Sequence, residues 1–220
     1  MTFGTNAAVG LNPVKYLSGA PYNDAVNWYP LVSGYSTALF RGDPVTFDTN
    51  GTLKVGVAGS AILGVFWGVT YTATTGIAPV TPSNYWPAST VTSGALNAWA
   101  AVIDDPDIVF SIQETNGSGL AGTALTQTNV GQNFNFLVGS GTTLTGISTT
   151  SLNNASGSPG SDSTKNLKII GFDPNIANPS GASAAGMPPA PATSGTSFQN
   201  WLVIINNHIY KGGTGTVGHS

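Results

Sequence analysis

From residue 31 onward, the apolar and polar positions of this chain alternate with a period close to two. Segments 45–47 and 53–57 both alternate in this way. The Asp-Thr-Asn-Gly sequence between them, at 48–51, is a turn signal because Asn-Gly tolerates positive φ. Together these segments predict a β-hairpin. Segment 61–71 is apolar on both faces and rich in β-branched and aromatic residues, which predicts a central strand.

A second hairpin is expected farther along the chain. Its strands are predicted at 96–103 and 108–113, and the Asp-Asp-Pro-Asp sequence at 104–107 connects them. A short helical turn is expected near 120–126, but no stretch keeps a helical period for more than about two turns. Further strands are predicted at 134–138, 167–172 and 201–210. The pattern therefore predicts a mainly β fold, a small antiparallel β-barrel or sandwich.

The segments outside this pattern divide the chain. Residues 1–30 are polar and aromatic without a clear period, and we expect them to form an extended N-terminal arm. Residues 31–210 are expected to form a single β-rich domain. Its long Gly/Ser/Pro-rich loops are predicted at 153–164 and 174–197, because both are low in complexity. Residues 211–220 are expected to be a flexible C-terminal tail.

Aromatic residues outside the predicted strands are the candidate partner-binding residues. Exposed aromatic side chains are costly unless something covers them. Trp86 is expected in a loop, where it stacks on a sugar, fills a pocket on a partner or packs locally; the sequence leaves these alternatives open. The tryptophans within predicted strands, in contrast, are expected in the core: Trp67, Trp99 and Trp201. The predicted partner-binding residues are Tyr16, Tyr22, Trp28, Tyr29 and Trp86.

Charge is scarce along the whole chain. Charged residues make up 7% of the 220, six of them basic and nine acidic, whereas a soluble domain ordinarily has about 25%. Such a surface is typical of a protein that copies of itself or a partner will cover. No cluster of Lys and Arg exists, so a nucleic-acid partner is not expected. The longest apolar run, 61–69, is too short to cross a bilayer, so no membrane partner is expected either.

Several short motifs resemble chemical sites, but each has a simpler explanation. Ser36 and His208 occur in the chain order of an α/β-hydrolase, yet the helices of that fold are missing from the pattern. The carboxylates at 104–107 match no EF-hand spacing, and acidic residues are ordinary in turns. The glycines at 213–218 lack a following helix to hold a pyrophosphate, and the Arg-Gly-Asp sequence at 41–43 fits a tight turn. No catalytic residue, metal site or cofactor is predicted, and the chain has no cysteine.

Four strings carry a resemblance to a known family. They are Gly-Asp-Pro-Val-Thr-Phe at 42–47, Ala-Ile-Leu-Gly-Val-Phe at 61–66, the segment 104–113, and Val-Ile-Ile-Asn-Asn-His-Ile-Tyr at 203–210. With their surroundings they cover about half the chain, and they resemble tailed-bacteriophage capsid decoration (cement) proteins and other virion structural proteins. The resemblance implies a non-enzymatic protein that binds the outside of an icosahedral shell and bridges major capsid subunits. It implies the major capsid protein as partner and a homo-oligomer, with a trimer favoured. The location implied is the exterior of the virion capsid, after synthesis in the host cytoplasm.

A second class of function fits the same composition. A carbohydrate- or receptor-binding module of a tail fibre or cell surface is also β-rich and heavy in Ser, Thr and Asn. Such a module would use Trp86 or Tyr85 as its stacking platform. A sugar-binding assay distinguishes the two classes, because a decoration protein is not expected to show saturable sugar binding.

Overall fold

The computed structural model describes residues 7–74, 80–94, 98–115, 125–155, 160–173, 198–212, 215, 216 and 218. Within these residues the chain is mainly β, as predicted, with no α-helix and two single turns of 3₁₀ helix, η1 (Gln127–Asn129) and η2 (Ile209–Lys211). The strands are β1 (Asn12–Tyr16), β2 (Asn27–Pro30), β3 (Leu39–Phe40), β4 (Pro44–Phe47), β5 (Leu53–Val55), β6 (Gly64–Tyr71), β7 (Thr81–Ser83), β8 (Tyr85–Trp86), β9 (Ala98–Ile103), β10 (Ile108–Thr115), β11 (Asn133–Phe134), β12 (Phe136–Leu137), β13 (Ser151–Asn153), β14 (Leu167–Phe172) and β15 (Asn200–Ile205).

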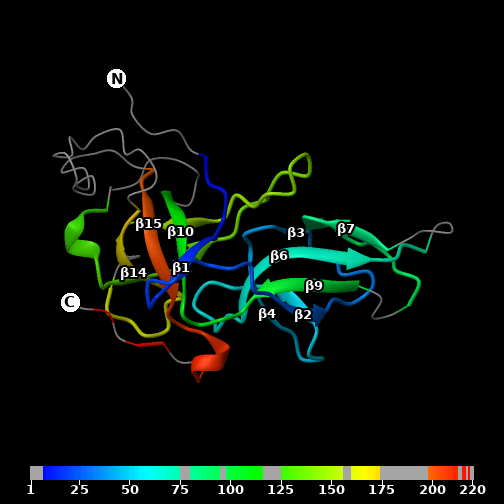
Figure 1. Cartoon of the computed structure of the whole chain (residues 1–220), viewed down its shortest axis with the longest axis horizontal. Coiled ribbons are helices and arrows are strands. Elements are labelled where there is room, and N and C mark those ends of the chain that lie inside the picture. The colour runs from blue at the N-terminus through cyan, green and yellow to red at the C-terminus, as the bar shows by residue number, and fades with distance from the viewer. Residues whose placement is uncertain are drawn as a thin grey trace.

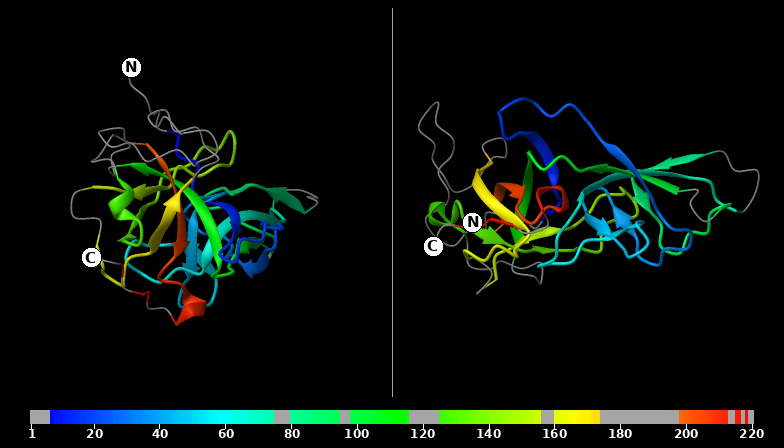
Figure 2. Two further views of the ribbon diagram at one scale, coloured as in Figure 1. Left: turned by 60° about the vertical axis from the view of Figure 1, so that its left-hand side comes forward. Right: turned by 90° about the horizontal axis from the view of Figure 1, so that it is seen from below.

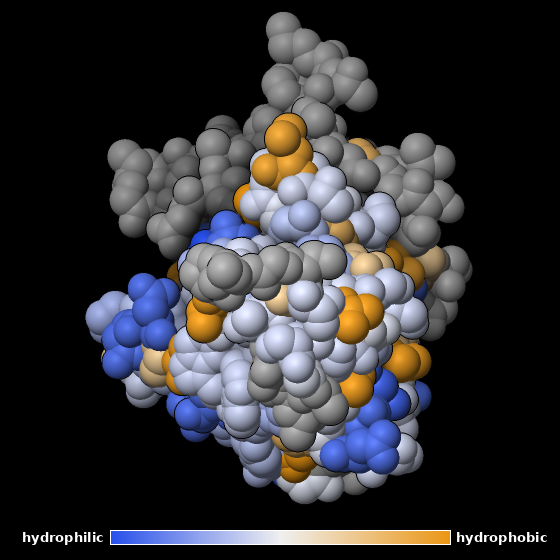
Figure 3. Space-filling model, turned by 90° about the vertical axis from the view of Figure 1, so that its right-hand side faces the viewer, coloured by the Kyte–Doolittle hydropathy of each residue, from blue (hydrophilic) through white to orange (hydrophobic). Residues whose placement is uncertain are grey.

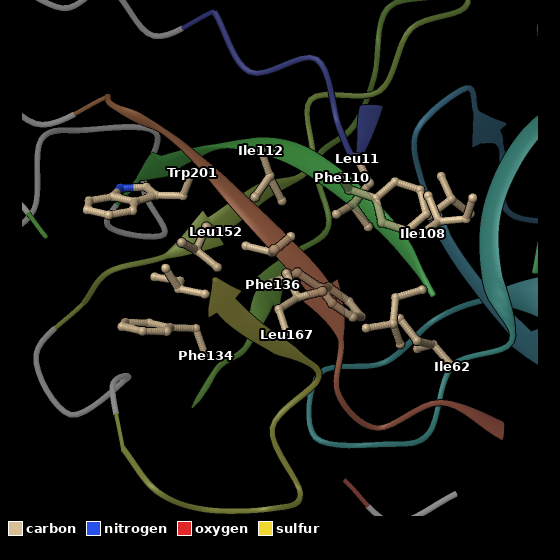
Figure 4. Close-up of a cluster of buried hydrophobic side chains, with 14 of the residues drawn as sticks. Leu11, Ile62, Ile108, Phe110, Ile112, Phe134, Phe136, Leu152, Leu167 and Trp201 are labelled. Atoms are coloured by element: carbon tan, nitrogen blue, oxygen red, sulfur yellow. The ribbon is translucent and has the colours of Figure 1, made fainter. Parts of the chain in front are cut away.

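The first sheet is a nearly closed barrel at the left in Figure 1. Its strand order is β11-β14-β15-β10-β13-β12, and β11 and β12 are separated by one residue, so the two ends of the order meet. The central strand β10 is buried along its whole length; it pairs antiparallel with β15 and parallel with β13. Large apolar side chains fill the interior, and Figure 4 shows them reaching from Trp201 and Phe134 at one end to Ile62 at the other.

The second sheet lies beside the barrel along the longest axis of the molecule (Figures 1 and 2). Its order is β2-β9-β6-β4-β5, with β7 added to the far part of β6. The predicted hairpin is confirmed, since β4 pairs with β5 from Val45↔Val55 to Phe47↔Leu53. The predicted central strand is confirmed as β6. A separate cluster of buried side chains packs under this sheet, including Phe66, Trp86 and Val102.

The predicted second hairpin is wrong. β9 and β10 do not pair with each other: β9 lies between β2 and β6 in the second sheet, whereas β10 is the centre of the barrel. The connection 104–107 therefore carries the chain from one sheet to the other. The physical reason is burial: both strands are almost wholly buried, and each gains two flanking strands by joining a different sheet.

The expected N-terminal arm is extended but is not separate from the body of the protein. β1 pairs with the first half of the central barrel strand β10, and β2 pairs with β9 at the edge of the second sheet. The segment thereby satisfies its backbone hydrogen-bonding groups and contributes one strand to each sheet. Residues 1–6 lie outside the described residues.

The remaining expectations were met in part. β14 matches the strand predicted at 167–172, and the strand predicted at 134–138 is split into β11 and β12. The strand predicted at 201–210 ends at Ile205, because Asn206 and Asn207 leave the ladder and hydrogen-bond to Asn166. Most of the predicted helical turn, part of the first low-complexity loop, all of the second and part of the C-terminal tail lie outside the described residues, namely 120–124, 156–159, 174–197, 213, 214, 217, 219 and 220.

Candidate binding surface

Two tryptophans lie half-exposed on the outer face of the second sheet. In the β2–β9 ladder Trp28 is opposite Ala101, and Trp99 is opposite Pro30. Because side chains alternate along a strand, these residues point away from the core into which Ala98, Ala100 and Val102 pack. The exposed fractions are 50% for Trp28 and 46% for Trp99. This places two large aromatic side chains on neighbouring strands of one exposed surface.

The neighbouring strands turn this surface into two shallow grooves. Gly68 and Thr70 of β6 continue the rows of Ala101 and Trp99, and Pro82 of β7 lies beside Thr70. The first groove, of about 320 Å³, is lined by Trp28, Gly68, Val69, Thr70, Pro82, Ser83, Asn84 and Ala101. The second, of about 310 Å³, is lined by Thr70, Tyr71, Thr72, Val80 and Trp99. No described residue that lines either groove is charged. We call these residues together the tryptophan face.

The structure reverses two of the predictions made for tryptophans. Trp99, expected in the core, is exposed because the alanines on either side of it face inward. Trp86, expected in a loop with partner binding and local packing both left open, lies in β8 and is fully buried, so it packs locally. Its indole N–H donates to the carbonyl of Tyr35 at 3.2 Å, and its ring packs edge-on against Tyr71. A side chain held in this way cannot form a stacking platform for a sugar.

The three tyrosines among the predicted partner-binding residues make contacts within the chain. Tyr16 and Tyr22 pack against the barrel core with ring centroids 6.3 Å apart. Their hydroxyls donate to Asn23 and to the carbonyl of Ala25. These bonds leave Trp28 as the member of the predicted set with a large exposed aromatic surface.

Tyr29 belongs to a polar cluster around the buried carboxylate of Asp104, at the connection between the two sheets. Its hydroxyl donates to the carboxylate of Asp104 and lies 2.7 Å from the hydroxyl of Tyr210. The amide of Asn27 donates to the same carboxylate at 2.9 Å. Burial and the bond to Asp104 raise the pKa of Tyr29. Tyr29 is therefore a structural residue of the connection between the sheets.

The hydrolase-like residues do not form a catalytic pair in the part of the chain that is described. Ser36 is exposed, whereas His208 is fully buried and its Nδ1 accepts the backbone N–H of Tyr210 at 3.0 Å. Burial lowers the pKa of His208 to about 4, so the imidazole is neutral at ordinary pH. No hydrogen bond joins these two described side chains.

The carboxylates at 104–107 are each occupied by other groups. Asp104 accepts from Asn27 and Tyr29, Asp105 accepts the backbone N–H of Asp107, and Asp107 pairs with Lys211 at 2.7 Å. Over the described ranges, no group of three or more His, Cys, Asp or Glu side chains is placed to hold a metal ion. Nor does any helix there have the length and apolar character to cross a membrane.

Comparisons with known proteins add no relative. No family model matches the chain, and the searches of curated proteins and of solved structures find no match.

Proposed function

We propose that this chain is a non-enzymatic virion structural protein, a decoration protein that binds the outer surface of an icosahedral phage shell and bridges its major capsid subunits. The observation that carries the proposal is the tryptophan face, an exposed sheet surface with two half-exposed tryptophans and no charged lining residue. Buried centres of protein interfaces are enriched in aromatic residues and depleted in charge. The resemblance of the four sequence strings to decoration proteins points in the same direction.

The rest of the surface suits a permanent cover on a particle. The end of the molecule formed by the second sheet has mostly side chains of intermediate hydropathy, with apolar ones scattered and strongly hydrophilic ones in separate groups toward its sides (Figure 3). With only 7% of residues charged, contacts made by Ser, Thr and Asn depend little on ionic strength. Each bound copy adds contact area across a seam between subunits, and this area opposes separation of the subunits. A homo-oligomer, with a trimer favoured, belongs to this proposal.

The test is binding to shells assembled from the major capsid protein of the same genome. Wild-type protein should co-sediment with the shells in fixed proportion, at low and at high salt. The double variant Trp28→Ala/Trp99→Ala should bind at least about tenfold more weakly, because aromatic anchors dominate interface energies. Because both side chains are also half-buried, the double variant should unfold at a somewhat lower temperature than wild type but remain folded under the binding conditions, as a thermal melt checks.

A matched control keeps the result specific. Val57→Ala removes an apolar side chain of 55% exposure that lines neither groove, and it should leave binding unchanged. Wild-type protein that does not bind shells overturns the proposed function. A double variant that binds as tightly as wild type assigns the contact to another surface.

A second candidate function is binding of a neutral glycan in the first groove. The observation that favours it is the set of hydrogen-bonding side chains beside Trp28: Thr70, Ser83 and Asn84. Stacking on an aromatic ring together with neutral hydrogen bonds suits a sugar. A glycan array with wild-type protein and Trp28→Ala decides between the two, because saturable binding lost in the variant favours the glycan.

A further inference from the structure

The loop 138–150, between β12 and β13, presents a leucine to solvent. Figure 1 shows this yellow-green loop projecting from the molecule above β3. Leu144 is 91% exposed, the largest exposure among the large hydrophobic side chains of the described residues. No residue of the loop is charged. A single exposed leucine on a flexible loop is ordinary on a protein surface. Its exposure is informative only if the loop is fixed by contacts with the rest of the protein.

A buried carboxylate anchors the C-terminal part of the loop to the second sheet. Asp43, just before β4, is 1% exposed. Its Oδ1 accepts the hydroxyls of Ser148 at 2.5 Å and Thr150 at 2.9 Å, and its Oδ2 accepts the backbone N–H of Phe40 at 2.8 Å. Burial raises the pKa of Asp43, and these three donors act against that rise. Charge-assisted bonds of this kind are the stronger class of hydrogen bond.

Close packing fixes the rest of the loop. Gly141, at φ +62°, lies so close to Phe40 that an added Cβ would come within 2.2 Å of the ring. Gly146, at φ +70°, leaves 2.8 Å between such an atom and Cβ of Asn84. Within the loop, the N–H of Thr142 donates to the carbonyl of Ile147 at 2.9 Å, and the N–H of Gly146 donates to the carbonyl of Thr142 at 2.7 Å. The tip is therefore closed by its own backbone bonds.

The loop also borders the tryptophan face. Asn84 lines the first groove, and the same residue is the one against which Gly146 packs. The backbone N–H of Arg41 lies between them, within 3.1 Å of the carbonyl of Asn84 and 2.9 Å of the carbonyl of Gly146. The groove and the base of the loop are thus adjacent, and no residue of the groove lining or of the loop is charged. A partner seated on the tryptophan face would extend from the groove to the loop.

We propose that Leu144 is a second anchor of the docking surface, which enters an apolar pocket of the shell subunit seated on the tryptophan face. This inference rests on the proposed function. A loop ordered before binding loses little conformational entropy on docking, so an apolar tip on such a loop contributes more to affinity than one on a flexible loop. The absence of charge in the loop and in the neighbouring groove fits an apolar, neutral pocket.

The experiment compares Leu144→Asp with Thr143→Asp in the shell-binding assay. Both variants add the same charge to an exposed position of the tip. Leu144→Asp should weaken binding at least about tenfold, as expected for loss of an anchor. Thr143→Asp should change binding by less than about threefold. Both variants should melt near the wild-type temperature, since neither side chain is buried.

The outcomes separate this inference from the proposed function. Wild-type protein that fails to bind shells overturns the proposed function and this inference with it. If wild type binds and Leu144→Asp binds equally well, the anchor is refuted while the proposed function stands. If Leu144→Asp lowers the solution mass of the free protein and leaves shell binding per subunit unchanged, Leu144 contacts a second copy of the chain, which also refutes a shell pocket.

Discussion

Replacing Glu114 by glutamine should change how the stability of this protein depends on pH. Glu114 is the chain's one glutamate; it lies at the end of β10 and is 0% exposed. The backbone N–H of Leu125 donates to Oε2 at 3.0 Å, whereas no hydrogen bond to Oε1 is found among the described residues. Burial raises the pKa of Glu114 from 4.5 to about 7, against the opposing effect of nearby donors such as Leu125 and Asn154. The ionised form is therefore destabilised in the folded state.

The sign and size follow from proton linkage. The folded chain holds the Glu114 proton more tightly than the unfolded chain, so this group stabilises the fold fully below about pH 4.5. That stabilisation is lost as the pH rises through about 7. A tenfold change in proton affinity corresponds to about 1.4 kcal/mol, so the total loss is about 3 kcal/mol. Most of it, about 2 to 3 kcal/mol, falls between roughly pH 5 and pH 8.

The assay is urea unfolding of wild type and Glu114→Gln at a series of pH values across that range. Glutamine does not titrate, so the stability of the variant relative to wild type should increase by about 2 to 3 kcal/mol from roughly pH 5 to pH 8. A Glu114→Gln difference that stays flat or decreases with pH would show that the folded state does not disfavour the ionised form of Glu114.

Two further substitutions test the packing. Trp86→Ala should destabilise the fold by about 3 to 5 kcal/mol in thermal or urea unfolding, because the ring is fully buried in the cluster of side chains under the second sheet. A loss below about 1 kcal/mol would contradict that placement. Gly141→Ala should cost about 1 to 3 kcal/mol through the clash with Phe40 and should also weaken shell binding. Gly34→Ala, at φ +77° with open space around it, isolates the backbone strain, so equal losses in the two variants would argue against the clash.

Local signals predicted the elements of the fold better than their partners. The hairpin of β4 and β5 and the strand β14 were predicted because alternation and turn chemistry act over a few residues. The pairing of β9 was mispredicted as a hairpin with β10. A strand that is apolar on both faces pairs with the strands that bury it most completely, and for β9 these are β2 and β6. The joining of the N-terminal segment to both sheets had no local signal.

The candidate surface was predicted only in part, for a similar reason. Trp28 was identified from its place in a segment without a core pattern, and the structure leaves it half-exposed. Trp99 was missed although a signal existed, since Ala98, Ala100 and Val102 define an inward face that excludes it. Trp86 had no such signal, because β8 is two residues long and Trp86 is buried by side chains from distant strands under the second sheet.

The order and kinds of residues along the chain are enough to show that this protein is built of β-strands and carries few charges. Composition and short-range periodicity carry both properties, and neither requires knowledge of distant contacts. Which tryptophans face solvent and which carboxylates are buried depends on how distant segments pack together. Asp43 illustrates the reason: it belongs to a tight turn, as predicted, but its hydroxyl partners Ser148 and Thr150 lie 105 and 107 residues away. Contacts over such separations depend on how the whole chain packs, and no local pattern encodes them.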